Sequence, residues 1–212
     1  MNSKSIADQL ALVNTIIYNV KNYPAIRQKL MDWGYPLQKV DEAEVSLNNT
    51  RLVQQAQQKS YRDKQSINRR WTAELTDVRT RYAEHRAVAK TIFRNQPDEL
   101  ERMRLKQPLP RRQSNWLEQM QDFYQELGEN KEMQKLGIKS DELTQTKAMV
   151  ASLVELRAQR LQCKGEAEST TQRRNQALAE LGTWRKEFIR VAKMALKDDP
   201  QLLEVLGIVV PA

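Results

Sequence analysis

Hydrophobic residues recur at helical spacing over long stretches of this chain. Between Lys39 and Asn95 there is neither glycine nor proline, so this stretch can form one helix of about 57 residues, roughly 85 Å long. In its second half the hydrophobic positions step by three or four residues throughout: Ile67, Trp71, Leu75, Val78, Tyr82, His85, Ala89 and Ile92. This stripe predicts a long amphipathic helix of the coiled-coil type.

The same pattern recurs 103 residues further along the chain. This offset relates Gly34 to Gly137 and Pro97 to Pro200, and without a gap it also relates Val88–Lys90 to Val191–Lys193. An ungapped series of this kind indicates a tandem duplication. We predict a helical repeat over residues 1–106, a proline-containing linker over 107–113 and a second repeat over 114–212, with the two repeats packing as one bundle.

Each repeat follows one plan, in which a shorter helix, a glycine turn, a long helix, a proline break and a short final helix succeed one another. Gly34 and Gly137 suit the left-handed position that closes a helix. Hydrophobic residues of the second long stretch include Leu143, Val150, Leu153, Leu161, Leu178, Leu181, Phe188, Ala192 and Ala195. We expect these residues to form its packing stripe, and we expect Trp33, Trp116 and Trp184 to pack as well.

Both long stretches become polar in the middle, over residues 54–66 and 162–176. Each stretch is therefore either one continuous helix or a hairpin that turns near Gly165 and its counterpart. The first copy has no turn residue there, which favours continuous helices.

The predicted fold class is all-α: an elongated, internally duplicated, four-helix-like bundle with long antiparallel coiled-coil helices and approximate twofold symmetry.

Composition supports this fold class and narrows the environment. Six Gly, seven Pro and three Phe in 212 residues are too few for a β-sandwich or barrel. The mean hydropathy is −0.75, and no uncharged apolar run reaches the length of a membrane span. The amino-terminal apolar residues fall at helical spacing, which favours an amphipathic helix over a signal peptide. With a single cysteine there is no internal disulfide, so we expect a cytoplasmic protein.

Residues suited to catalysis are scarce. His85, the only histidine, lies on the hydrophobic stripe, and its counterpart at the 103-residue offset is Phe188, so we predict an interior packing role. Cys163 has Lys164 beside it but no histidine partner. No phosphate-binding loop, dinucleotide loop, zinc spacing or serine elbow is present. We expect no enzyme activity, no catalytic residue, no metal, no cofactor and no evident small-molecule substrate; an apolar ligand in the bundle core is the least favoured hypothesis.

Charge is distributed unevenly. Residues 51–112 contain sixteen Lys and Arg against seven acidic residues, so this segment holds essentially all of the formal net charge of +8. Basic residues of this segment that could contact phosphates or an acidic partner are Arg69, Arg79, Arg86, Lys90 and Arg94. The other interpretation is a solvated face that keeps a long bundle soluble.

Three segments resemble an uncharacterised bacterial family: Pro200–Pro211, Thr170–Leu178 and Leu136–Ile138, which are Pro-Gln-Leu-Leu-Glu-Val-Leu-Gly-Ile-Val-Val-Pro, Thr-Thr-Gln-Arg-Arg-Asn-Gln-Ala-Leu and Leu-Gly-Ile. Members of that family look like alanine-rich helical proteins with a closing Leu-Gly-Ile turn, in some cases before a β-sandwich module. The resemblance covers mainly residues 133–211, and residues 30–105 only through the repeat. This chain carries the unit twice, is richer in Arg and Gln, and has no β-module. The resemblance implies a helical fold and no particular activity.

Together these features predict a non-enzymatic structural or scaffold protein that interacts with a protein partner or with a second copy of itself. The alternative is a nucleic-acid-binding protein that uses the basic face of residues 51–112. Neither hypothesis includes a membrane partner.

Overall fold

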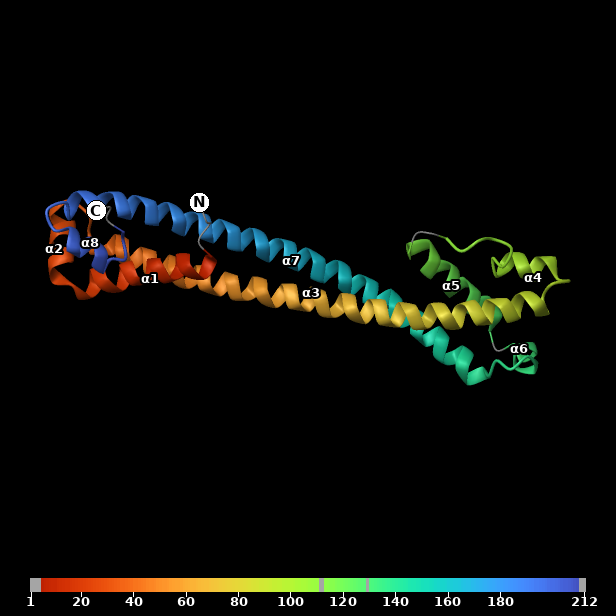
Figure 1. The fold of residues 1–212 in the computed structure, drawn as a ribbon. Coiled ribbons are helices and arrows are strands. Elements are labelled where there is room, and N and C mark those ends of the chain that lie inside the picture. Colours follow the sequence, from red (N-terminus) through yellow and green to blue (C-terminus); the bar gives the residue numbers. More distant parts are fainter. Residues whose placement is uncertain (1–4, 111–112, 129, 210–212) are drawn as a thin grey trace. The chain divides into compact units, whose positions relative to one another are not determined.

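The computed structural model describes residues 5–110, 113–128 and 130–209, and every regular element within them is a helix (Figure 1). The helices are α1 (Ile6–Asn22), α2 (Pro24–Asp32), α3 (Leu37–Ile92), α4 (Pro97–Arg102), α5 (Gln113–Leu127), α6 (Lys131–Lys135), α7 (Ser140–Ala195) and α8 (Pro200–Val205). The predicted all-α fold class is confirmed. No helix in the described part of the chain is both long and apolar enough to cross a membrane.

Helices α3 and α7 are continuous, and each is 56 residues long. The polar stretches 54–66 and 162–176 lie inside them, so the hairpin alternative does not occur. Gly165 is exposed, and a Cβ atom built on it meets nothing within 4 Å. Glycine therefore costs some helix propensity there without breaking the helix.

The chain divides into two compact units, both of which contain parts of α3 and α7. Unit 1 comprises Met1–Ser60 and Ala167–Ala212. Its core joins α1, α2 and α8 to the first part of α3 and the last part of α7, and the ring of Phe188 lies there against Tyr35 and Trp184 at centroid distances of 5.6 and 5.3 Å. Lys21 of α1 bridges Asp41 and Glu44 of α3 at 2.6 and 2.7 Å.

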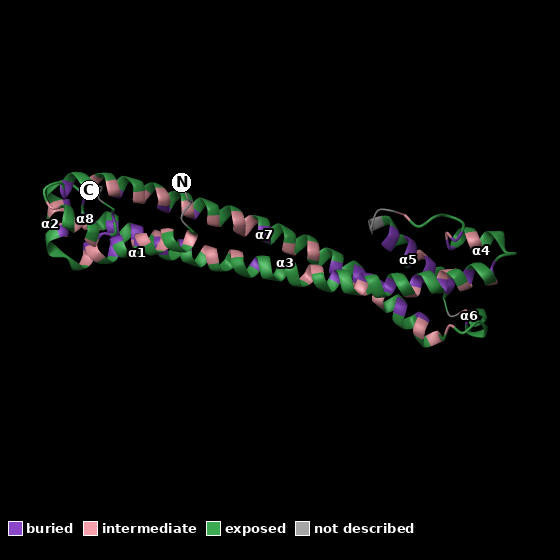
Figure 2. Cartoon of the chain, viewed as in Figure 1, coloured by how far each residue is buried: buried purple, intermediate pink, exposed green. Residues whose placement is uncertain are grey.

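Unit 2 comprises Tyr61–Glu166. Its core contains residues of the stripe predicted on α3, which pack on residues of α5 and α7. Figure 2 marks the buried residues of these helices in purple. Tyr82 is fully buried in an aromatic cluster with Trp116, Phe123 and Tyr124. The two long helices run antiparallel within this unit, because Asn68 contacts Arg160 while Glu74, further along α3, contacts the earlier residue Ser152.

The two compact units do not coincide with the two predicted repeats, since each unit combines segments of both. The bounds of α3 and α7 nevertheless differ by 103 residues at both ends, as do those of α4 and α8. The domain boundaries from the sequence stay a prediction. Residues 111 and 112 of the predicted linker, and the Arg111 and Arg112 charges counted in the basic segment, lie outside the described residues.

Four short helices, α2, α4, α6 and α8, end in the same way. After each of them a backbone N–H bonds to the carbonyl five residues earlier, as from Tyr35 to Leu30 at 2.9 Å and from Leu105 to Leu100 at 2.8 Å. The residue before that N–H has a positive φ, 73° at Gly34 and 94° at Gly137, which confirms the left-handed closures predicted there. At α4 this position is Arg104, with φ 52°, so a side chain occupies a conformation that favours glycine.

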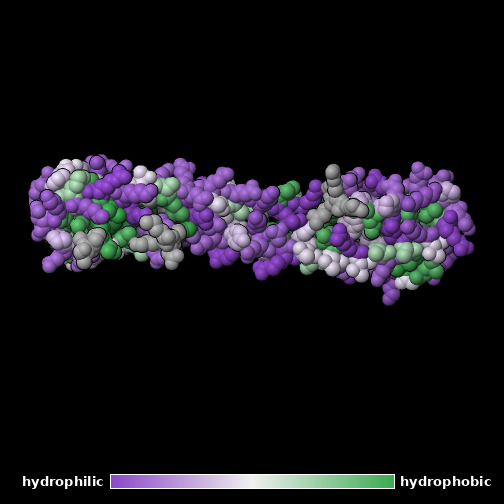
Figure 3. Space-filling model, turned by 45° about the horizontal axis from the view of Figure 1, so that its top comes forward, coloured by the Kyte–Doolittle hydropathy of each residue, from purple (hydrophilic) through white to green (hydrophobic). Residues whose placement is uncertain are grey.

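Two packing predictions are wrong. Trp33, at the end of α2, is 55% exposed, and Leu161 of α7 is 64% exposed. Trp33 lies immediately before the left-handed Gly34, where the chain turns and Tyr35 enters the core instead. Figure 3 shows that hydrophilic side chains cover most of the visible surface of α3 and α7, whereas hydrophobic side chains gather where the other helices lie.

Candidate basic interface

Three of the five predicted contact residues are available for a partner. Arg69, Lys90 and Arg94 are exposed and make no hydrogen bond or ion pair with any residue that the structure describes. All three belong to unit 2. Solvated cations without carboxylate partners can contact phosphate or an acidic surface without first breaking an internal bond.

The other two predicted residues take part in the fold. The Arg79 guanidinium lies 4.6 Å from the centroid of the Trp116 ring, which is a cation–π contact. Arg86 donates from Nη2 to the backbone carbonyls of Leu105 at 3.2 Å and of Gln107. It thereby satisfies carbonyl groups in the turn after α4, where the helix no longer supplies donors.

A basic pocket lies between α3 and α7 within unit 2. It has a volume of about 330 Å³ and is lined by Lys64 and Asn68 of α3 and by Arg157, Arg160, Leu161 and Lys164 of α7. Of these described lining residues, four are cationic and none is acidic. Arg160 donates from Nε to Oδ1 of Asn68 at 2.8 Å, and its guanidinium lies 4.8 Å from the centroid of the Trp71 ring.

Sequence reasoning missed this pocket because three of its cations lie outside the basic segment 51–112. A signal was present, since Arg157, Arg160 and Lys164 follow the spacing of three and four that places side chains on one helix face. Helix α3 contributes Lys64, which lies within the basic segment 51–112 but was not among the five residues predicted to contact a partner.

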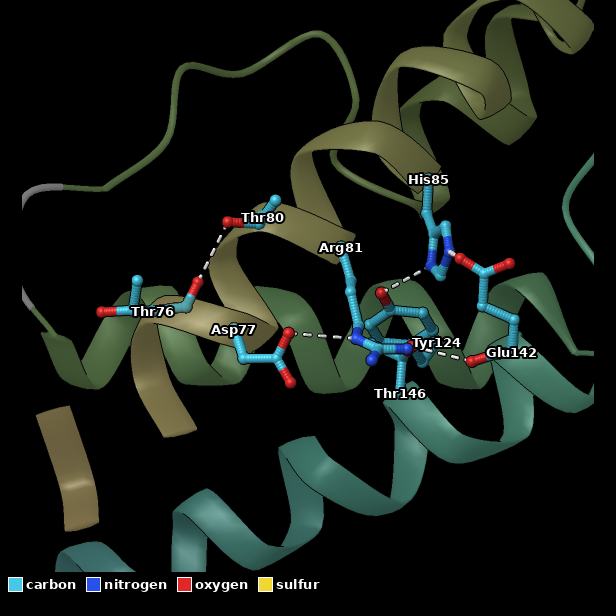
Figure 4. Close-up of polar contacts among 8 residues, drawn as sticks. All are labelled: Thr76, Asp77, Thr80, Arg81, His85, Tyr124, Glu142 and Thr146. Atoms are coloured by element: carbon cyan, nitrogen blue, oxygen red, sulfur yellow. Dashed lines mark hydrogen bonds and ion pairs between the residues drawn. The ribbon is translucent and has the colours of Figure 1, made fainter. Parts of the chain in front are cut away.

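His85 is the centre of a buried polar contact in unit 2. It is completely buried, and its Nδ1 lies 2.9 Å from the Tyr124 hydroxyl while its Nε2 lies 3.1 Å from Oε1 of Glu142 (Figure 4). These contacts join α3 to α5 and α7. The interior position predicted for His85 is confirmed, with two polar partners in addition to packing.

Burial shapes the acidity of the phenols around His85. Loss of solvent contact raises the pKa of Tyr124 well above its ordinary value, and it is raised further by the phenolate of Tyr82, which forms only at alkaline pH, and by the carboxylate of Glu142. Burial also raises the pKa of Tyr82 to about 12. Both hydroxyls are therefore neutral near pH 7, and neither is prepared to act as a base.

Cys163 is the remaining residue that the sequence offers for chemistry. Cys163 is a free, partly buried cysteine on α7. Across the described residues there is no group of three or more His, Cys, Asp or Glu that could hold a metal ion.

Comparison with known proteins finds no match: no family model, no curated protein and no solved structure aligns significantly with the chain. Any functional assignment therefore rests on the geometry of the chain itself.

Proposed function

We propose that this chain is a non-enzymatic interaction protein of the scaffold type, located in the cytoplasm and built from a duplicated helical unit. The duplication is supported by the equal offset of 103 residues between the bounds of α3 and α7 and between those of α4 and α8. The interaction role is supported by an exposed apolar stripe on α7.

This apolar stripe consists of Ala151, Val154, Ala158 and Leu161, which are all exposed and follow one another at steps of three, four and three residues. Val154 is 38% exposed and Leu161 is 64% exposed. The stripe lies beside the buried positions Val150 and Leu153, which face the core of unit 2. Such steps are typical of a coiled-coil seam, so the stripe suits a partner helix from a second copy or from another protein.

Size-exclusion chromatography with light scattering tests this proposal. We expect wild-type protein to self-associate with increasing concentration, and we expect Val154→Glu with Ala158→Glu to remain a monomer, because two carboxylates would be buried in the new interface. The control is Gln145→Glu with Gln159→Glu, which adds the same charge at exposed positions of α7 outside the stripe. A monomer at all concentrations that also retains no protein from a lysate would contradict the proposal.

A second candidate function, nucleic-acid binding, is favoured by the three unpartnered cations Arg69, Lys90 and Arg94. Changing these three to Glu should abolish binding of duplex DNA or single-stranded RNA in a fluorescence anisotropy titration at low salt, and wild-type binding should weaken steeply with salt. Arg79 and Arg86 are left intact in this variant, since their contacts with Trp116 and with backbone carbonyls stabilise the fold. Unchanged affinity would exclude this face.

A further inference from the structure

We infer that the basic pocket of unit 2 is a binding site for the phosphate group of a nucleotide, either free or within a single strand. This site differs from the predicted basic face, because none of Arg69, Arg79, Arg86, Lys90 and Arg94 lines it. It does not depend on the proposed scaffold function.

The first argument is the positive charge that Lys64, Arg157 and Arg160 place in one pocket. Lys64 and Arg160 are partly buried, Arg157 is exposed, and all three line the pocket together with Lys164. Like charges in one pocket repel each other, and partial burial weakens the screening by water. Since no described lining residue is acidic, a bound anion would relieve this repulsion.

The second argument is the orientation of Arg160. Its Nε donates to Asn68, and its Cζ lies over the ring of Trp71, 4.8 Å from the ring centroid; Trp71 is 2% exposed. These two contacts hold the guanidinium group in place, while its Nη1 and Nη2 groups have no hydrogen-bond partner among the described residues. A fixed planar fork with free terminal donors matches the tetrahedral oxygens of phosphate, and an ordered donor loses little entropy on binding.

The third argument concerns the class of anion. Three or more cations exceed the single charge of one carboxylate, whereas a terminal phosphate carries roughly −1.5 to −2 at neutral pH and a strand brings one negative charge from each of several neighbouring phosphodiesters. The volume of about 330 Å³ is at the lower end of pockets that hold small ligands. Size and charge together therefore favour a phosphate or pyrophosphate group over an acidic peptide.

An aromatic residue beside the pocket favours a nucleotide as the source of the phosphate. Tyr61 precedes Lys64 by three residues on α3, so the two residues are neighbours on the helix surface, and Tyr61 is 50% exposed. An exposed ring next to a phosphate site can stack on a base of any sequence. Stacking on Tyr61 should therefore add nothing to the affinity for pyrophosphate, because pyrophosphate has no base.

The test uses the full chain and three probes: pyrophosphate alone, ATP without metal, and a short fluorescein-labelled oligothymidylate. Calorimetry follows the first two probes and fluorescence anisotropy the third. The pocket variant is Lys64→Gln with Arg157→Gln, which leaves the contacts of Arg160 intact. Its control is Lys131→Gln with Lys139→Gln, which removes the same charge from exposed positions of unit 2 that do not line the pocket.

We expect the pocket variant to weaken all three probes by about tenfold or more, because charge-assisted hydrogen bonds to phosphate are lost, while the control stays close to wild type. Arg160→Lys keeps the positive charge but loses the planar guanidinium, so it should also weaken the binding of all three probes. Tyr61→Leu should weaken ATP and the oligothymidylate but not pyrophosphate. Tighter binding of the oligothymidylate than of ATP would identify a strand as the source; the reverse order would identify a free nucleotide.

Three results would overturn the inference: no binding of any probe to wild-type protein, equal losses in the pocket and control variants, or equally tight binding of polyglutamate. Thermal unfolding of each variant, followed by circular dichroism, separates a binding loss from a folding loss. Light scattering of Lys64→Gln alone, which changes α3 and leaves the stripe on α7 intact, keeps the outcome distinct from the scaffold proposal: this variant should bind the probes more weakly and self-associate as wild type does.

Discussion

Positions 85 and 188 are related by the 103-residue offset, and the two units use them differently. In unit 2, His85 is buried and contacts the Tyr124 hydroxyl and Glu142. In unit 1, Phe188 is equally buried and packs between Tyr35 and Trp184. The same helical position thus accepts either a polar junction or an apolar one, provided that every buried polar atom of the ring finds a partner.

Truncation of Phe188 should lower the stability of the protein more than any other change proposed for this pair of positions. Phe188→Ala is expected to lower the free energy of unfolding by about 3–5 kcal/mol, because it removes a fully buried ring and leaves a cavity. Chemical denaturation followed by circular dichroism measures this change. Phe188→Leu serves as the control and should cost much less; equal losses for the two variants would argue against a packing role.

Alkaline pH should have the next largest effect, through the buried phenol of Tyr82 in unit 2. Burial raises the pKa of Tyr82 to about 12, above its ordinary value near 10, and also raises that of Tyr124. The folded state therefore holds the Tyr82 proton more tightly, so the stability that Tyr82 contributes is complete below about pH 10 and lost toward about pH 12. For Tyr82 the loss is on the order of 2–3 kcal/mol. Unfolding free energies measured across this range should fall less in Tyr82→Phe, and an identical pH dependence would refute this assignment.

The third prediction replaces His85 of unit 2 with phenylalanine, the residue type that unit 1 has at the corresponding position 188. His85→Phe should cost about 1–3 kcal/mol, because the Tyr124 hydroxyl is left without its imidazole partner in the core. Adding Tyr124→Phe should recover part of this loss. A double-mutant cycle on the unfolding free energy measures the coupling between the two residues, and strict additivity would show that the contact contributes nothing.

Substitutions at helix ends should change the free energy of unfolding least. Gly34→Ala should cost about 1 kcal/mol, since φ is 73° at this position and alanine is strained there. Arg104→Gly, the converse change after α4, relieves that strain but loses the ion pair with Asp122 at 2.9 Å, so its net effect should be under about 0.5 kcal/mol. Thermal melts of both variants, and of Arg104→Gly with Asp122→Asn, test this balance.

Much of the fold followed from features that act locally along the chain. Gly34, Gly137, Pro97 and Pro200 mark helix ends that the structure confirms, and the stripe from Ile67 to Ile92 lies against the core of unit 2. Continuity of α3 could be predicted from the absence of glycine and proline. Helix periodicity and termination depend on neighbours within a few residues, and such neighbours are visible in a sequence.

The candidate sites depended on which distant residues meet. The sequence contained every cation of the basic pocket, yet only the antiparallel pairing of α3 and α7 within unit 2 brings Lys64 to Arg157 and Arg160. The same holds for His85, whose partners Tyr124 and Glu142 come from other helices. Composition and helical period determined the fold class, whereas the sites required tertiary structure, because charge convergence and buried hydrogen bonds arise between residues far apart in the chain.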